Sequence, residues 1–100
     1  MFKSLTTEEF KNELNNQDKI LIDLRTDKER NIFGQIQKNQ LNIDFYSPNI
    51  ASQILSLDKS KKYLIYCRHG NRSEVAMNFM KDNGFSWVCD LKGGINTWNG

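Results

Sequence analysis

The residues with the clearest chemical potential in this 100-residue chain stand together between positions 67 and 73. Cys67 is one of two cysteines, and two of the four arginines, Arg68 and Arg72, follow it within five positions. The thiolate rather than the thiol is the nucleophile, and neighbouring positive charges favour the thiolate. The segment is therefore a candidate for nucleophilic thiol chemistry.

The position of Cys67 in the chain adds to this expectation. It closes an apolar, strand-like run over residues 63–66 and precedes a polar loop and an expected helix. In open α/β sheets, ligands bind outside the carboxyl ends of the strands. Backbone amides at the start of a helix lack intrahelical partners, and the helix dipole adds positive potential there. Since one helix terminus supplies only about 0.3–1 kcal/mol, loop amides and arginines must contribute most of any thiolate stabilisation.

The elements that must position this loop are read from alternating apolar runs and helix signals. Strands are expected over residues 19–24, 41–45, 63–67 and 85–89. Helices are expected to begin near Thr6, Asp27, Ser47 and Ser73, with a final helical turn over residues 95–98. Alternating strands and helices predict βαβ units. We therefore expect one α/β domain over residues 1–100, with a mostly parallel sheet covered by helices on both faces.

Local signals define the ends of several of these helices. Thr6-x-x-Glu9 is a capping-box pattern, and Ser47-Pro48 is typical of an N-cap followed by proline at the first helical position. Gly34 is expected to end the helix over residues 27–33.

The helix that follows the polar loop has its own signals. Ser73 is interpreted as its N-cap rather than as a nucleophile, and Asn83-Gly84 is interpreted as its end. The expected buried stripe of this helix consists of Val75, Ala76, Phe79 and Met80.

Composition excludes several classes of protein. The net charge of +2 is too small and too scattered to indicate nucleic-acid binding, and no apolar run reaches the roughly 18 residues of a membrane span. Residues 1–6 lead directly into two glutamates without an apolar secretory segment, so a cytoplasmic protein is expected. Two cysteines and one histidine indicate neither a disulfide framework nor a four-ligand zinc site.

Three segments together resemble the rhodanese family of sulfurtransferases. The segment 67–73, Cys-Arg-His-Gly-Asn-Arg-Ser, resembles the family's active-site loop C-R-x-G-x-R-S. Residues 21–25, with Glu29 and 34–36, resemble its L-I-D-V-R…G-H-I segment, and residues 91–98 resemble its closing L-x-G-G-x-x-x-W. The three matches occur in family order and span nearly the whole chain.

The resemblance implies a rhodanese fold with a parallel five-stranded sheet, and a covalent mechanism on Cys67. The Cys67 thiolate would take sulfane sulfur from an anionic donor such as thiosulfate and pass it, as a persulfide, to cyanide or a thiol. No metal or organic cofactor would be required. The residues implied to bind the substrate or the persulfide are Arg68, His69, Gly70, Asn71, Arg72 and Ser73.

Other functions remain open at this level. The domain could carry a persulfide in a sulfur relay to another protein, or be a non-catalytic rhodanese-like regulatory module. Four residues separate Cys67 from Arg72, whereas the related phosphatase and arsenate-reductase loops have five. The shorter loop suits a single terminal sulfur better than a tetrahedral oxyanion, so a phosphatase is disfavoured. The cationic Arg68 and the titratable His69 favour an anionic donor.

Asp23, Arg25 and Glu29 are interpreted as a supporting charge network near the site. Arg72 either serves the substrate or pairs with Asp23 or Glu29. Residues 34–39 lack the family's usual histidine and proline, which predicts altered loop geometry rather than lost activity. Cys89, in an apolar run, is interpreted as a core residue, with a resolving thiol as the alternative.

Overall fold

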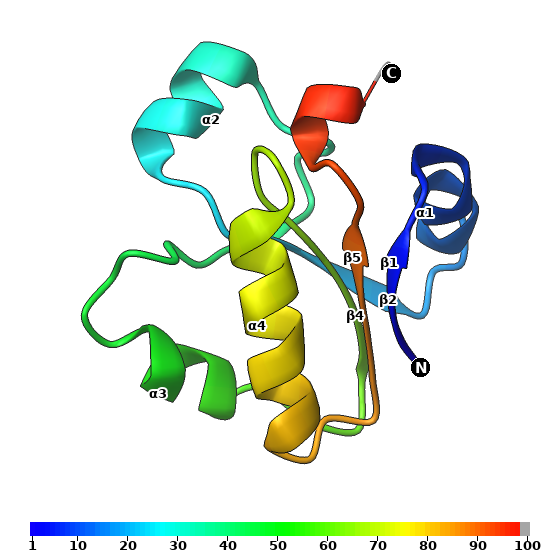
Figure 1. The fold of residues 1–100 in the computed structure, drawn as a ribbon, viewed down its shortest axis with the longest axis vertical. Coiled ribbons are helices and arrows are strands. Elements are labelled where there is room, and N and C mark those ends of the chain that lie inside the picture. The colour runs from blue at the N-terminus through cyan, green and yellow to red at the C-terminus, as the bar shows by residue number, and fades with distance from the viewer. Residues whose placement is uncertain (99–100) are drawn as a thin grey trace.

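A five-stranded, entirely parallel sheet forms the centre of the computed structural model, which describes residues 1–98 (Figure 1). The strands are β1 (Phe2–Leu5), β2 (Lys19–Asp23), β3 (Leu41–Asn42), β4 (Lys62–Tyr66) and β5 (Trp87–Leu91), in the order β1-β5-β4-β2-β3. Every neighbouring pair is parallel. The predicted α/β class and parallel sheet are confirmed.

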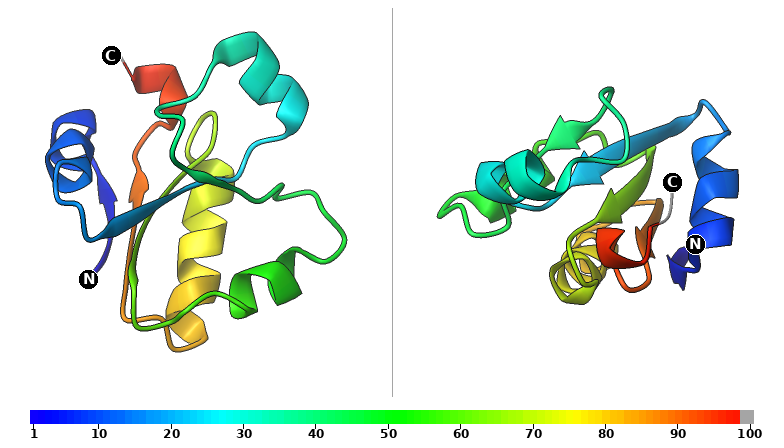
Figure 2. Two further views of the ribbon diagram at one scale, coloured as in Figure 1. Left: turned by 180° about the vertical axis from the view of Figure 1, so that it is seen from behind. Right: turned by 90° about the horizontal axis from the view of Figure 1, so that it is seen from above.

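Helices lie on both faces of this sheet (Figure 2). They are α1 (Thr7–Leu14), α2 (Asp27–Phe33), α3 (Ile50–Leu55), α4 (Asn71–Asp82) and the short 3₁₀ helix η1 (Ile95–Thr97). Buried residues of α3 and α4 pack in one core cluster, whereas Phe10 of α1 packs in a second cluster with Ile95 and Trp98 at its edge. The loop joining β4 to α4 lies at the end of the molecule where α2 and η1 also lie (Figure 1).

The sheet differs from the sequence-based expectation mainly at its edges. β1 was not predicted, because four residues with two partly buried side chains carry little signal of their own. β1 becomes a strand by pairing with β5, from Phe2 opposite Val88 to Leu5 opposite Leu91. β3 has two residues instead of the expected five, and β5 begins two residues later than expected.

The helix starts are partly as predicted. The capping box of Thr6 and Glu9 is present, and α2 ends at Gly34 as expected. The prediction of a helix starting at Ser47-Pro48 is wrong: α3 begins at Ile50, because Ser47 accepts the Ile50 N–H in a preceding turn.

α4 begins earlier than expected. It starts at Asn71, with Gly70 at the N-cap in a left-handed conformation (φ +100°), so Ser73 lies inside the first turn and is not the N-cap. Val75 was expected to point inward but is 58% exposed. Starting the helix at Asn71 leaves Val75 outside the stripe of Ala76, Met77 and Met80 that packs on the sheet. No helix within residues 1–98 is long and apolar enough to cross a membrane.

Candidate active site

Cys67 lies directly after β4, and its sulfur is enclosed by the loop that leads into α4. The residue is 1% exposed. The Gly70 N–H donates to Cys67 Sγ at 3.1 Å and the Ser73 N–H donates to it at 3.4 Å. Ser73 Oγ lies 3.6 Å from the same sulfur. Two backbone amides and a hydroxyl therefore surround the one atom of the loop suited to nucleophilic attack.

The first residues of η1 and the glycine that precedes them contact this loop. Ile95 and Asn96 donate their N–H groups to the carbonyls of Cys67 and Arg68, at 2.9 and 3.0 Å. A Cβ on Gly94 would lie 2.3 Å from the Arg68 carbonyl oxygen, so the approach of the two segments requires glycine there. The sequence pattern placed Gly93-Gly94 in the closing segment over residues 91–98 but did not indicate its contact with the Cys67 loop.

Arg68 and His69 form the outer part of the loop. The Arg68 guanidinium lies 4.1 Å from the centre of the Phe33 ring, and His69 and Asn71 are exposed. A pocket beside the loop is lined by Arg68, Phe33, Gly34 and Gln35 together with Ile95, Asn96 and Trp98. The pocket therefore offers an arginine and an aromatic ring next to the strand end that carries the thiol.

Arg72 is held by Glu29 of α2. Its two terminal nitrogens donate to the two Glu29 carboxylate oxygens at 2.8 and 2.7 Å, and its guanidinium lies 5.2 Å from the Tyr46 ring centre. The hydrogen bonds from Arg72 lower the pKa of Glu29 to about 2, and Glu29 raises the pKa of Arg72. Of the two carboxylates considered as partners for Arg72, the structure places Glu29 in contact with it.

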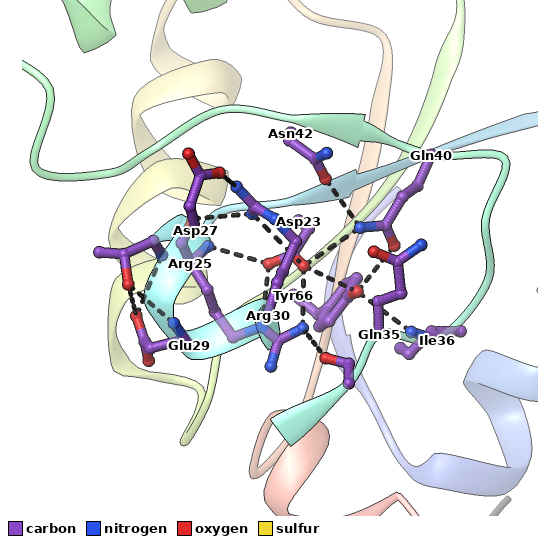
Figure 3. Close-up of polar contacts among 12 residues, drawn as sticks. Asp23, Arg25, Asp27, Glu29, Arg30, Gln35, Ile36, Gln40, Asn42 and Tyr66 are labelled. Atoms are coloured by element: carbon purple, nitrogen blue, oxygen red, sulfur yellow. Dashed lines mark hydrogen bonds and ion pairs between the residues drawn. The ribbon is translucent and has the colours of Figure 1, made fainter. Parts of the chain in front are cut away.

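Asp23 and Arg25 form a buried pair at the end of β2 (Figure 3). Arg25 donates to both carboxylate oxygens of Asp23, at 3.0 and 2.9 Å, and both side chains are fully buried. Burial alone would raise the pKa of Asp23, but the hydrogen bonds from Arg25 outweigh it and lower that pKa.

The same pair anchors the segment that lacks the expected histidine and proline. Arg25 donates to the Gly34 carbonyl at 2.6 Å, and Asp23 accepts from Gln40 at 3.1 Å. The Tyr66 hydroxyl donates to Asp23 at 3.0 Å and accepts a hydrogen bond from the Ile36 N–H at 3.3 Å. Burial raises the pKa of Tyr66 to about 12. The segment 34–40 is thus held by Asp23 and Arg25 at the end of β2 and by Tyr66 of β4 (Figure 3).

Sequence analysis did not identify Asp90 of β5, which lies beneath the Cys67 loop. Asp90 Oδ2 accepts from Ser73 Oγ at 2.7 Å, and Oδ1 accepts from Ser4 Oγ at 2.5 Å. The residue is 1% exposed, and burial raises its pKa. The available signal was a carboxylate between Cys89 and Leu91, directly after the predicted strand, and a carboxylate buried there needs a polar partner.

Cys89 lies in the other core cluster, with Phe10 and Leu64, whereas Cys67 belongs to the cluster of α3 and α4. Burial raises the pKa of the Cys89 thiol, which disfavours its thiolate. Within residues 1–98, no group of three or more histidine, cysteine, aspartate or glutamate side chains is arranged to hold a metal ion.

Comparison with known proteins identifies one family model, Rhodanese-like domain, which matches residues 6–100. The chain is 34% identical to a tRNA sulfurtransferase of Haemophilus influenzae over 72% of its length, and 34% identical to a tRNA uridine(34) hydroxylase of Onion yellows phytoplasma over 91%. It spans only 15% and 30% of these two proteins, respectively.

A solved structure resembles the whole fold. The crystal structure of a rhodanese-related protein from Thermoplasma volcanium superposes with a TM-score of 0.80 at 30% identity. The match covers 96% of this chain and 89% of that one.

Proposed function

Since the chain belongs to the rhodanese-like domain family, we propose that it is a sulfurtransferase that carries sulfane sulfur as a persulfide on Cys67. The observation that supports this most is the enclosure of the Cys67 sulfur by the Gly70 and Ser73 amides. Backbone N–H groups aimed at a sulfur anion stabilise it without a compensating cation. The name of the tRNA sulfurtransferase relative fits sulfur transfer in general, and the donor and acceptor are part of our proposal.

The proposed donor is an anionic sulfur compound such as thiosulfate. The Cys67 thiolate attacks the outer sulfur, a new S–S bond forms, and the old S–S bond breaks with its electron pair leaving on sulfite. Cyanide or a thiolate then attacks the outer sulfur of the persulfide and regenerates the Cys67 thiolate. Arg68 supplies positive charge at the mouth of the loop, since Arg72 is paired with Glu29.

Intact mass after incubation with thiosulfate tests the proposal. We expect a gain of one sulfur atom in the wild type and in Cys89→Ala, and no gain in Cys67→Ala. Subsequent addition of cyanide should release thiocyanate and restore the original mass. A protein that gains no sulfur and forms no thiocyanate would contradict the proposal.

A second candidate is a persulfide relay to another protein. Phe33 is 47% and Tyr46 67% exposed, and they lie against Arg68 of the loop and Arg72 of the first turn of α4, respectively. Exposed aromatic rings are typical of protein interfaces. The test is a competition between thiosulfate and a protein persulfide, such as that of a cysteine desulfurase. Faster loading of Cys67 by the protein donor supports the relay, and faster loading by thiosulfate contradicts it.

The remaining alternatives are less well supported by the loop. A regulatory module does not need the Cys67 thiol, and a phosphatase needs a wider loop than four residues between Cys67 and Arg72. Turnover of an aryl phosphate would indicate a phosphatase.

A further inference from the structure

Asp23 and Asp90 are the fully buried aspartates among residues 1–98, and of these two Asp23 alone has a cation beside it. Asp23 pairs with Arg25 at 2.9 Å. Within residues 1–98, no arginine, lysine or histidine lies within ion-pair distance of Asp90, whose partners are the hydroxyls of Ser4 and Ser73. An unpaired buried carboxylate is costly, and such a group tends to take up a proton.

Ser73 connects this carboxylate to the Cys67 thiol. Its hydroxyl lies 2.7 Å from Asp90 Oδ2, 3.6 Å from Cys67 Sγ and 3.2 Å from the Gly70 carbonyl oxygen. A serine hydroxyl has one hydrogen and two lone pairs. When that hydrogen points to ionised Asp90, the oxygen accepts from the Cys67 thiol. When Asp90 is protonated and donates to Ser73, the serine hydrogen is free to point at a thiolate.

We propose that Asp90 is a positioning residue that takes up the Cys67 proton through the Ser73 hydroxyl. The S–H bond breaks and leaves its electron pair on sulfur, while the proton binds to Ser73 Oγ. The original Ser73 hydrogen moves to Asp90 Oδ2 and forms a carboxylic acid. The negative charge thereby moves from Asp90 to Cys67, the total charge stays the same, and no oxidant or co-reactant is needed.

The surroundings of both groups support this exchange. On the sulfur, the new charge receives hydrogen bonds from the Gly70 and Ser73 N–H groups. Burial, with the charge of Glu74 on α4 as a smaller contribution, raises the pKa of Asp90. The residues directly opposite Asp90 on the neighbouring strands, Ser4 of β1 and Ile65 of β4, are uncharged. The use of the resulting thiolate as the sulfur nucleophile rests on the function proposed above. The proton transfer itself does not.

The pH dependence of Cys67 alkylation by iodoacetamide, followed by mass spectrometry from about pH 4 to about pH 10, tests the coupling. Two groups that share one proton give a range in which the thiolate fraction does not change with pH. The wild type should therefore show a plateau, with less than about a twofold change in rate, before a second rise. Asp90→Asn should show one rise, of about tenfold per pH unit, and no plateau. Ser73→Ala keeps both titrating groups but removes the hydroxyl between them, so the alkylation rate on its plateau should be lower than in the wild type.

Ser4→Ala is the matched control, because it removes the other hydroxyl bound to Asp90 but leaves the path to Cys67 intact. We expect Ser4→Ala to keep the plateau. Identical profiles for the wild type and Asp90→Asn would overturn the proposal. Loss of the plateau in Ser4→Ala, with the plateau kept in Asp90→Asn, would also overturn it.

Infrared spectroscopy provides a second measurement that does not depend on folding of the Asp90 variant. At neutral pH the wild type should show the carbonyl stretch of a protonated carboxylic acid, and Cys67→Ser should lack it. Equal bands in both proteins would contradict the proposal. Alkylation and infrared spectra report on the thiol and the carboxyl even if no sulfur is transferred, so failure of the sulfurtransferase function is separately recognisable.

Discussion

Charge pairing at single residues decides which cations of the site face an anionic donor. The charge of Arg72 is balanced by Glu29 through two hydrogen bonds, whereas within residues 1–98 no acidic side chain lies within ion-pair distance of Arg68. Arg68 instead stacks on the Phe33 ring, which leaves its charge available at the pocket beside the loop. We therefore propose that Arg72 holds the loop on α2 and that Arg68 attracts the proposed anionic donor.

Glu29→Gln should remove a pH-dependent part of the stability. The hydrogen bonds from Arg72 lower the pKa of Glu29 from 4.5 to about 2. A lowered folded-state pKa gives stability that is present above about pH 4.5 and is lost as the pH falls toward 2. The loss is at most about 3 kcal/mol in the wild type.

The measurement is the free energy of unfolding in urea at several values of pH. Glutamine retains the capping contact to the Thr26 N–H but carries no charge, so the pH dependence over this window should be smaller. Equal pH dependence in both proteins would show that the pair with Arg72 contributes nothing.

At the scale of elements, α2 and the η1 turn hold the Cys67 loop from two sides. α2 carries Glu29 at its third position, where the residue completes a capping box with Thr26 and also binds Arg72. On the other side, Gly94 lies against the loop, and the N–H groups of Ile95 and Asn96 in η1 bind the carbonyls of the loop. The geometry of the thiol site thus depends on two segments that contain no nucleophile.

Thr26→Ala should weaken both stability and sulfur transfer, whereas Thr6→Ala should weaken stability alone. Both threonines close capping boxes, so each substitution should cost about 1 kcal/mol in the free energy of unfolding. Only the helix after Thr26 carries residues in contact with the loop. The two variants are compared by the rate of thiocyanate formation and by urea unfolding. An equal effect of both substitutions on that rate would contradict the role of α2 in holding the loop.

Gly94→Ala should disrupt the loop, with Gly84→Ala as the control. Both glycines have positive φ, at +65° and +87°. A Cβ at position 94 would meet the Arg68 carbonyl oxygen at 2.3 Å, while at position 84 the nearest atom is the end of the Lys59 side chain at 4.0 Å.

We expect Gly94→Ala to cost roughly 3 kcal/mol or more and to abolish most sulfur transfer. Gly84→Ala should cost about 1–2 kcal/mol and leave the transfer rate unchanged. Urea unfolding and thiocyanate formation measure the two effects, and normal activity in Gly94→Ala would rule out a tight loop contact.

At the scale of the whole molecule, the parallel sheet separates the two thiols. Cys67 packs with α3 and α4 on one face, and Cys89 packs beneath α1 on the other. A disulfide between them would require the sheet to open. Of the two cysteines, only Cys67 lies at a strand end with a loop and pocket beside it, so we expect thiol chemistry at Cys67 and not at Cys89.

Alkylation in increasing urea should distinguish the two cysteines. Cys89 should react at least roughly a thousandfold more slowly in the folded than in the unfolded protein, because it becomes accessible only on global unfolding. Its rate should rise with urea in parallel with the unfolded fraction. A Cys89 rate comparable to that of Cys67 without urea would instead support the resolving-thiol alternative.

Local patterns predicted much of the fold because they act over a few residues. The signals lie within a few residues for each correctly predicted feature: the capping box at Thr6, the helix end at Gly34 and the central strands β2 and β4. Predictions were wrong where a local signal competed with packing. At Ser47-Pro48 a turn replaces the first helical turn, and α4 starts two residues before Ser73 so that this serine faces Cys67.

The sequence by itself determined the α/β class and the family resemblance, and it singled out Cys67 as the candidate nucleophile, because residue type, spacing and strand position carry that information. Only the tertiary structure decided that Arg72 pairs with Glu29, that Gly94 supports the loop and that Asp90 reaches the thiol through Ser73. These contacts join residues 17 to 43 positions apart, and β1 likewise exists only beside β5. Such partners depend on how the chain returns to one end of the sheet, which no local pattern encodes.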